Sequence, residues 1–298
     1  MPISNPANFV NVNVSDLQTN HPICFPGGRL TLSATNPIAD VSGATTFYYL
    51  PYAHGVVPFW NNALSVWEYR PIPEAGLSLT RPTENPRIVD VFATTRPNEP
   101  NTFGMDIQSW TNDTTRFIPM FRKNGVPVVA YTGGETPLRT YLGSIRFVGS
   151  NGAATMMDTV TQRFVFNAHN RVKKRVLRYE PTFNWTYTGT PWRQWNNSSL
   201  NRIEIVDGIG SELLDLTFTA RAICPANVYA QYGLGVDTNA NVTDSYINGN
   251  GDQTVVARLS RVLGLGYHYC QAMESVATPG TPTFFGQGYL GLQGTWQC

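Results

Sequence analysis

Apolar and polar residues alternate with a period of two along much of the chain. In residues 139–149, one face of an extended segment would carry Tyr141, Gly143, Ile145 and Phe147. Residues 212–222 repeat the pattern, and their apolar positions are Leu214, Leu216, Phe218, Ala220 and Ala222. This period is typical of antiparallel strands that bury one face. The pattern therefore predicts a strand over each segment.

Further segments of this kind recur along the chain, separated by turn residues. They are 47–52, 65–70, 87–94, 103–110, 126–131, 161–167, 183–188, 202–207, 227–235, 254–270 and 283–293. Between these segments lie clusters of turn residues rich in Gly and Asn, at 26–28, 123–125, 149–152 and 248–252. Many short strands with such turns are typical of sandwiches and barrels. We therefore expect an all-β fold, with two antiparallel β-sandwich (jelly-roll-like) domains and an extended N-terminal arm.

The expected organisation has four parts. Residues 1–40 are rich in Asn and Pro and form the extended arm, which would lie on a neighbouring domain or subunit. Residues 41–165 form the first β-domain and residues 181–298 the second. Residues 166–180 connect them and hold the main charge cluster: Arg171, Lys173, Lys174, Arg175 and Arg178. This cluster is interpreted either as a solvated connector or as a basic strip that faces a partner.

Charged residues are scarce in this sequence. They make up 14% of the 298 residues, against about 25% in an average globular protein. The net charge is +1, with 18 Arg but only 3 Lys. A nearly neutral chain is not expected to bind nucleic acid through phosphate contacts. The sequence contains no run of 18 or more apolar residues, so it predicts no membrane insertion. The first residues show no signal-peptide pattern.

The sequence contains no clear catalytic, cofactor or metal motif. His268 and Cys270 would share one face of a strand, but nothing nearby would lower the pKa of the thiol. The loop 237–244 resembles the start of a calcium loop, yet the required Gly and Glu positions hold Val242 and Asn248. The four cysteines are expected to be free thiols, with a disulfide between Cys270 and Cys298 as the alternative. We therefore predict no enzyme activity and no cofactor.

Residues between 183 and 195 are the main candidates for contacts with a glycan or with a protein interface. The candidates are Trp185, Tyr187, Trp192, Arg193 and Trp195. Aromatic rings beside Asn, Gln and Arg can stack on sugar faces while the polar groups bind hydroxyls. The alternative is that these rings fill the core of a small sandwich, because aromatic side chains dominate core burial.

Several runs of residues carry a resemblance to a known group of proteins. In the first half they are Trp110–Arg116, Tyr141–Gly143, Arg163–Asn167 and Asn170–Val172. In the second half they are Trp185–Thr188, Trp192–Gln194, Asn196–Ser199, Asn201–Ile205, Gly266–Tyr269 and Phe285–Gln287. Together, over roughly residues 45–295, they resemble tailed-bacteriophage virion structural proteins, found as tail-fibre-like, baseplate or head-decorating components. The resemblance implies a virion location, β-rich domains and a homotrimer, and it brings no catalytic residues.

Three functions follow from these observations. The first is a tail fibre, tailspike or baseplate appendage that is assembled in the host cytoplasm and contacts other virion proteins and a host surface glycan. The second is a capsid decoration protein, either a cement protein or a head fibre, that stabilises the shell. The third is an enzyme that degrades polysaccharide, such as a depolymerase or an esterase.

Overall fold

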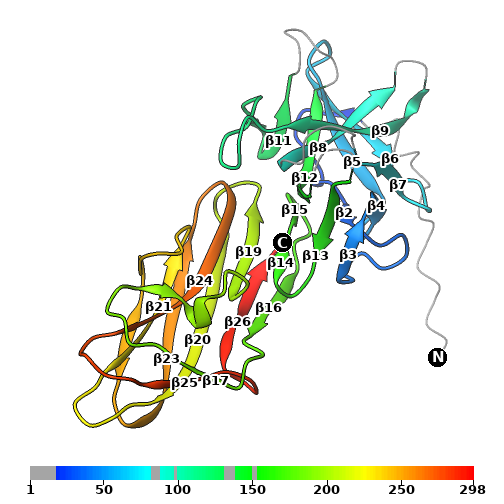
Figure 1. The fold of residues 1–298 in the computed structure, drawn as a ribbon. Coiled ribbons are helices and arrows are strands. Elements are labelled where there is room, and N and C mark those ends of the chain that lie inside the picture. The colour runs from blue at the N-terminus through cyan, green and yellow to red at the C-terminus, as the bar shows by residue number, and fades with distance from the viewer. Residues whose placement is uncertain (1–17, 82–87, 97–98, 131–137, 150–152) are drawn as a thin grey trace, which may run out of the picture.

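The computed structural model describes residues 18–81, 88–96, 99–130, 138–149 and 153–298. The described residues fold almost entirely into strands, so the prediction of an all-β, sandwich-like fold is confirmed. Figure 1 shows two β-rich bodies, one built mainly from the first half of the chain and one from the second, with the C-terminus between them. The one helical turn in the described part of the chain is η2 (Trp195–Asn197).

In the described residues, the first body contains β1 to β15, most of which are short. They are β1 (Gln18–Thr19), β2 (Gly28–Thr31), β3 (Val41–Ala44), β4 (Thr46–Pro51), β5 (Val56–Asn61), β6 (Val66–Pro71), β7 (Leu77–Thr80), β8 (Ile88–Arg96), β9 (Glu99–Ser109), β10 (Phe121–Lys123), β11 (Val126–Val129), β12 (Arg139–Val148), β13 (Thr155–Asp158), β14 (Gln162–Arg163) and β15 (Val165–Asn167). Two three-stranded sheets, β1-β6-β5 and β2-β4-β7, accompany the longer β8, β9 and β12 ladder. The core of this body includes Phe47, Phe59, Phe103 and Phe147.

The second body is a sandwich of two sheets. Its strands are β16 (Lys173–Tyr179), β17 (Asn184–Thr186), β18 (Arg193–Gln194), β19 (Arg202–Asp207), β20 (Leu213–Ile223), β21 (Ala230–Val236), β22 (Tyr246–Gly249), β23 (Asp252–Val262), β24 (Gly266–Val276), β25 (Thr283–Phe285) and β26 (Gly291–Gln297). One sheet has the order β16-β26-β20-β25-β17, with β23 also paired to β20. The other contains β19-β24-β21-β22, with β18 also paired to β24.

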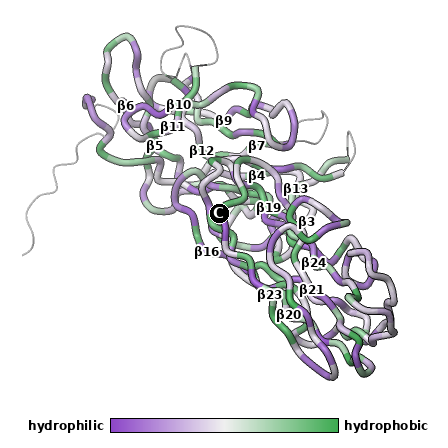
Figure 2. The backbone as a smooth tube through the Cα atoms, turned by 90° about the vertical axis from the view of Figure 1, so that its left-hand side faces the viewer, coloured by the Kyte–Doolittle hydropathy of each residue, from purple (hydrophilic) through white to green (hydrophobic). Residues whose placement is uncertain are grey.

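The alternation in β20 explains how the sandwich closes. Its even-numbered apolar residues, from Leu214 to Ala222, are buried, while Leu213, Asp215 and Ile223 are exposed. The buried face packs with Ile203, Ile205, Leu234 and Ala272 from the opposite sheet in one core cluster. Figure 2 shows hydrophobic and hydrophilic stretches interspersed through both bodies, as this alternation requires.

The two bodies share backbone pairing. The short strand β14 pairs in parallel with β19, so one sheet continues from the first body into the second. The shared core cluster also contains Ile88, Trp110 and Phe164 from the first body. The junction is therefore packed and hydrogen-bonded.

Residues 166–180 differ from the expected solvated connector. Lys173–Tyr179 form β16, which pairs along its whole length with β26 near the C-terminus. Val176 on this strand is fully buried in the core of the sandwich. The segment is held in the sheet by backbone pairing with a strand that lies more than 110 residues away in the sequence, and it buries Lys174 and Val176 on its inner face.

Two further expectations change in detail. Part of the predicted arm, Gly28–Thr31, is buried as β2 against β4, while residues 1–17 lie outside the described residues. The predicted long strand 254–270 is instead two strands, β23 and β24, separated by a turn at residues 263–265. Gly264 in this turn has a φ of 109°, a conformation that favours glycine.

Candidate functional site

The five candidate residues lie close to one another at one edge of the second sandwich. Trp185 is on β17, Arg193 is on β18, and Trp195 begins η2 directly after β18. Arg193 is paired with Glu274 of β24, so the two side chains share one face of the sheet. Glu274 was not a candidate from the sequence, yet it is the residue that joins this group.

Glu274 is a buried carboxylate with three donors. The indole Nε1 of Trp185 donates to its Oε2 at 2.9 Å, and Arg193 Nε donates to its Oε1 at 2.7 Å. The backbone N–H of Asn196 is the third donor. Burial raises the pKa of Glu274 to about 7, although the charge of Arg193 and the hydrogen bonds oppose this shift.

Tyr187 packs against the arginine of this ion pair. The Arg193 guanidinium lies over the Tyr187 ring, 3.8 Å from the ring centroid. The Tyr187 hydroxyl donates to the carbonyl oxygen of Pro191 at 2.8 Å, which fixes the ring within its own loop. A stacked guanidinium with a carboxylate partner is a rigid group, so β18 is held firmly against the sandwich.

Trp195 has the role that the core interpretation predicts. It is fully buried, and its ring packs edge-on against Trp185 and Phe218, with centroids 5.3 and 5.0 Å apart. Trp185 itself is half-buried and stacks with Phe284. These two tryptophans therefore support the site from inside.

Trp192 points to the opposite, outer face of the same sheet. Its ring contacts Tyr246 of β22 edge-on, at 6.1 Å between centroids, and Tyr246 is 60% exposed. Gln231 of β21 and Asn248 of β22 lie on this face too, joined by a hydrogen bond of 3.0 Å. We call Trp192, Tyr246, Gln231 and Asn248 the outer aromatic face. The sequence pattern did not identify Tyr246, Gln231 or Asn248, because they lie beside Trp192 only through the pairing of β18 with β24, β24 with β21, and β21 with β22.

The residues of the predicted basic strip separate instead of forming one surface. Lys173 and Arg175 are exposed on the outer face of β16, whereas Lys174 between them is buried. Arg171 forms an ion pair with Glu212, and Arg178 is half-buried. They separate because neighbouring residues on a strand point to opposite faces.

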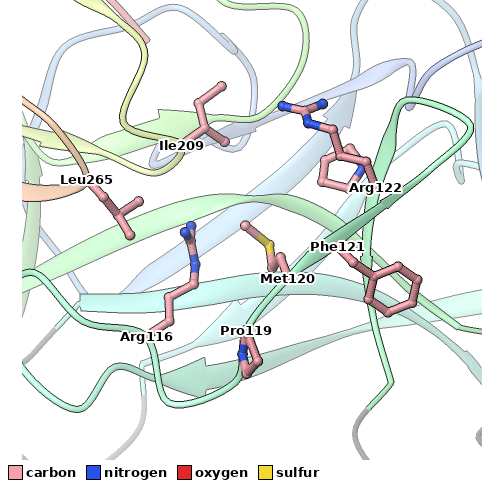
Figure 3. A pocket seen from close by; sticks show the side chains of 8 residues that line it. Arg116, Pro119, Met120, Phe121, Arg122, Ile209 and Leu265 are labelled. Atoms are coloured by element: carbon pink, nitrogen blue, oxygen red, sulfur yellow. The ribbon is translucent and has the colours of Figure 1, made fainter.

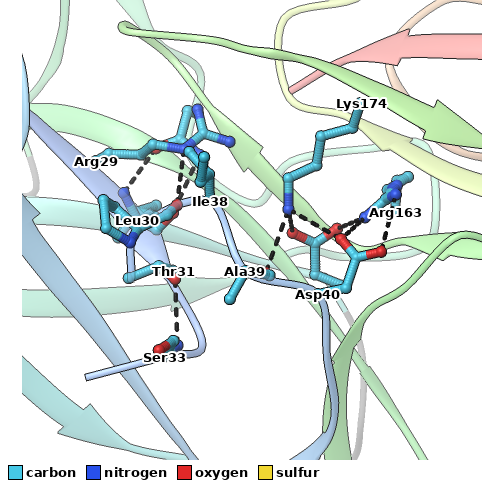
Figure 4. A network of polar contacts seen from close by, with 12 residues as sticks. Arg29, Leu30, Thr31, Ser33, Ile38, Ala39, Asp40, Arg163 and Lys174 are labelled. Carbon is cyan, nitrogen blue, oxygen red and sulfur yellow. Dashed lines mark hydrogen bonds and ion pairs between the residues drawn. The ribbon is translucent and has the colours of Figure 1, made fainter. Parts of the chain in front are cut away.

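Lys174 belongs to a buried network at the junction of the two bodies (Figure 4). Its Nζ lies 2.6 Å from Asp158 Oδ2, and Arg163 Nη1 lies 3.2 Å from the other oxygen of that carboxylate. Arg163 also reaches Asp40 at 2.5 Å, and it donates to the carbonyl oxygen of Arg175. The network links β13, β14 and β16, so its role is to fix the junction.

The other residues weighed from the sequence take part in structural contacts. Cys270 is fully buried and burial raises the pKa of its thiol, while His268 Nδ1 lies 2.8 Å from Asp237 Oδ2. Asp244 in the 237–244 loop forms an ion pair with Arg261. Among the described residues, no three His, Cys, Asp or Glu side chains are grouped so that they could hold a metal ion. All four cysteines are free in the structure.

The described helical structure includes nothing long and apolar enough to cross a membrane. No protein-family model and no curated protein sequence matches the chain.

Some solved structures share a distant similarity with the chain. One is a glycoside hydrolase family 43 arabinoxylan arabinofuranohydrolase from Bacillus subtilis, at 12% identity and a TM-score of 0.24, covering 92% of this chain and 69% of that one. Another is the mosquito-larvicidal Cry4Aa toxin from Bacillus thuringiensis, at 8% identity and a TM-score of 0.26, covering 91% and 51%. The insecticidal delta-endotoxin Cry8Ea1 from Bacillus thuringiensis has 6% identity and a TM-score of 0.25, covering 92% and 52%. The chain spans about half the length of both toxins, and TM-scores this low carry no argument about fold or activity.

Proposed function

We propose that this chain is a structural component of a tailed-phage virion that contacts the host, and that its outer aromatic face binds a surface glycan. The virion role rests on the resemblance of its sequence motifs to tailed-phage structural proteins. The glycan role rests on the geometry of the outer aromatic face. The two are separate claims and need separate tests.

The outer aromatic face combines the two chemical features that sugar recognition uses. The rings of Trp192 and Tyr246 offer apolar surface for the C–H groups of a pyranose, and both keep a polar tip. The amides of Gln231 and Asn248 lie on the same face and can donate to and accept from hydroxyl groups. This exposed pairing of rings and amides is the observation that carries the glycan proposal.

The buried part of the site makes this face rigid. Trp192 directly precedes β18, and Arg193, the first residue of that strand, is held by Glu274 and Tyr187. A ring held by a rigid backbone loses little freedom when a ligand binds. The ion pair thus contributes to recognition without touching the ligand.

Glycan binding is tested by applying wild-type protein and single variants to an array of bacterial surface polysaccharides. We expect Trp192→Ala and Tyr246→Ala to weaken binding by about tenfold or more, a loss of about 1.4 kcal/mol. Phe117→Ala is the matched control, because Phe117 is 65% exposed in a loop of the first body. Binding that is equal in all three variants, or no binding by the wild type, would contradict the glycan proposal.

The virion role is tested on the particle itself. Electron cryomicroscopy of the intact phage should place this chain in the tail, and density on the icosahedral shell would instead identify it as a capsid decoration protein. Light scattering of the purified protein should give the mass of a homotrimer, and a monomer at micromolar concentration would contradict that state. If the purified protein released reducing ends from host polysaccharide, that result would favour the third function, an enzyme that degrades polysaccharide.

A further inference from the structure

A cavity of about 380 Å³ lies between the two bodies, and none of the residues that line it belongs to the outer aromatic face. The residues that line it are Arg116, Pro119, Met120, Phe121, Arg122, Pro127, Ile209 and Leu265. The first six belong to the first body and the last two come from turns of the second (Figure 3). Its volume is within the range of small-molecule sites in proteins.

Arg116 forms a fixed, nearly buried donor in the cavity wall, with its side chain 10% exposed. Its Nε donates to Asp90 Oδ2 at 2.6 Å, and its Nη2 donates to the Tyr141 hydroxyl at 3.2 Å and to the carbonyl oxygen of Gly208. The guanidinium also lies over the Trp110 ring, 4.6 Å from the centroid. Its third nitrogen, Nη1, has no acceptor among the described residues, so it remains available to a ligand.

Arg122 adds a positive charge to the cavity wall that no acidic side chain among the described residues pairs with. Asp90 balances Arg116, whereas Arg122 donates to the carbonyl oxygen of Gly125 at 2.9 Å and forms no ion pair within the described ranges. The charge of Arg122 also acts on His169. Burial, together with the charges of Arg171 and Arg122, lowers the pKa of His169 to about 4. The field in and around the cavity therefore favours an anion.

The remaining wall is apolar. Met120 and Pro119 face Ile209 and Leu265 across the cavity, and Pro127 also lines it. A fully hydrated inorganic anion would gain little from such walls, because burial of apolar ligand surface is the main contribution that they can make. The lining suits a molecule with one charged end and an apolar remainder.

We propose that this cavity binds a small organic anion in which a carboxylate is joined to an apolar body. The carboxylate accepts from Arg116 Nη1 and pairs with Arg122, and the apolar body packs on Met120, Ile209 and Leu265. Because these groups come from both bodies, the bound anion bridges them and stabilises their arrangement. This inference does not depend on glycan binding or on a virion location.

The test uses phenylbutyrate as the probe and its neutral amide, phenylbutyramide, as the matched ligand, with calorimetry on the full chain. We expect saturable binding of the carboxylate and binding of the amide that is weaker by about tenfold. The melting temperature should rise with phenylbutyrate concentration, since the ligand binds the folded state. Equal affinity for both ligands, or no saturation by the carboxylate at roughly 10 mM, would overturn the proposal.

Three variants locate the binding. Arg122→Gln should weaken phenylbutyrate binding by about tenfold with little effect on the fold, because Arg122 is exposed. Met120→Trp, which fills the cavity, should abolish binding. Arg258→Gln, an exposed arginine on β23 in the second body, is the control and should bind like wild type. Unchanged affinity in Arg122→Gln and Met120→Trp would place the ligand elsewhere and overturn the proposal.

Discussion

The indole N–H of Trp185 donates to the carboxylate of Glu274, with 2.9 Å between Nε1 and Oε2. The two residues are 89 positions apart in the sequence and belong to different sheets of the second sandwich. Arg193 binds the same carboxylate from the strand beside it. Glu274 therefore links β17 of one sheet to β18 and β24 of the other, and its contribution to the stability of the fold depends on pH.

The titration of Glu274 gives the first prediction, which concerns how the free energy of unfolding changes with pH. Burial raises the pKa of Glu274 to about 7, so the folded protein holds a proton there that the unfolded chain releases near pH 4.3. Stability from this group is therefore full below about pH 4.3 and is lost as the pH rises through about 7, by about 4 kcal/mol. Denaturant unfolding from pH 5 to pH 8 should show a flatter profile for Glu274→Gln than for wild type. Parallel profiles would mean that Glu274 does not titrate in this range.

Lys174 gives a second prediction, at the junction of the two bodies. Lys174→Met should destabilise the protein by about 3 kcal/mol, because it leaves the buried Asp158 carboxylate without one of its two cations. Lys173→Met is a matched control on the same strand, since Lys173 is exposed, and it should change the stability by less than about 0.5 kcal/mol. The free energy of unfolding in urea measures both. Similar values for the two variants would show that the network does not stabilise the junction.

Gly294 gives a third prediction, in the middle of β26. A Cβ at this position would lie 2.0 Å from the carbonyl oxygen of Asp215 and 2.9 Å from the Cα of Leu216, on the neighbouring strand. Gly294→Ala should therefore force β26 away from β20 and cost about 2 kcal/mol or more. Gly55→Ala is the control, because a Cβ there meets no atom within 4 Å. Thermal unfolding would contradict this prediction if both variants melted at the same temperature.

The cysteines give a fourth prediction. All four are free; Cys24 is half-buried, whereas Cys224, Cys270 and Cys298 are buried. Burial raises the pKa of the Cys298 thiol to about 12, which keeps it protonated and unreactive at neutral pH. Native protein should therefore be alkylated first at Cys24, and unfolded protein without reductant should take up four labels, as counted by mass spectrometry. An uptake of only two labels would instead reveal a disulfide.

The strands were largely predictable from the sequence, because the evidence for them is local. The alternation in 212–222 matches β20 closely, since one face of that strand is buried and the other is open to solvent. The prediction was wrong where two strands adjoin: 254–270 contains a reversal at Gly264 between two β-like segments, and the period of two does not reveal a turn that short. The sequence left 166–180 as either a solvated connector or a basic strip that faces a partner, and it did not indicate that β16 is paired with β26.

The candidate site was predictable only in part. The sequence indicated Trp185, Tyr187, Trp192, Arg193 and Trp195 because they are close together along the chain. It offered no signal for Glu274 or Tyr246, whose relation to these residues depends on the pairing of β18 and β22 with strands β24 and β21. The same is true of Arg116 and Asp90, which lie 26 positions apart and meet at the cavity wall.

The sequence by itself determined which residues form strands and which face of each strand is apolar, because these properties depend on neighbouring residues and on a fixed period of two. Only the tertiary structure decided which strands pair, and therefore which side chains share a face. Pairing is set by packing between segments that are distant in the sequence, and a shift of one residue exchanges the buried and exposed faces. The separation of Trp195 into the core and Trp192 onto the surface follows from that pairing.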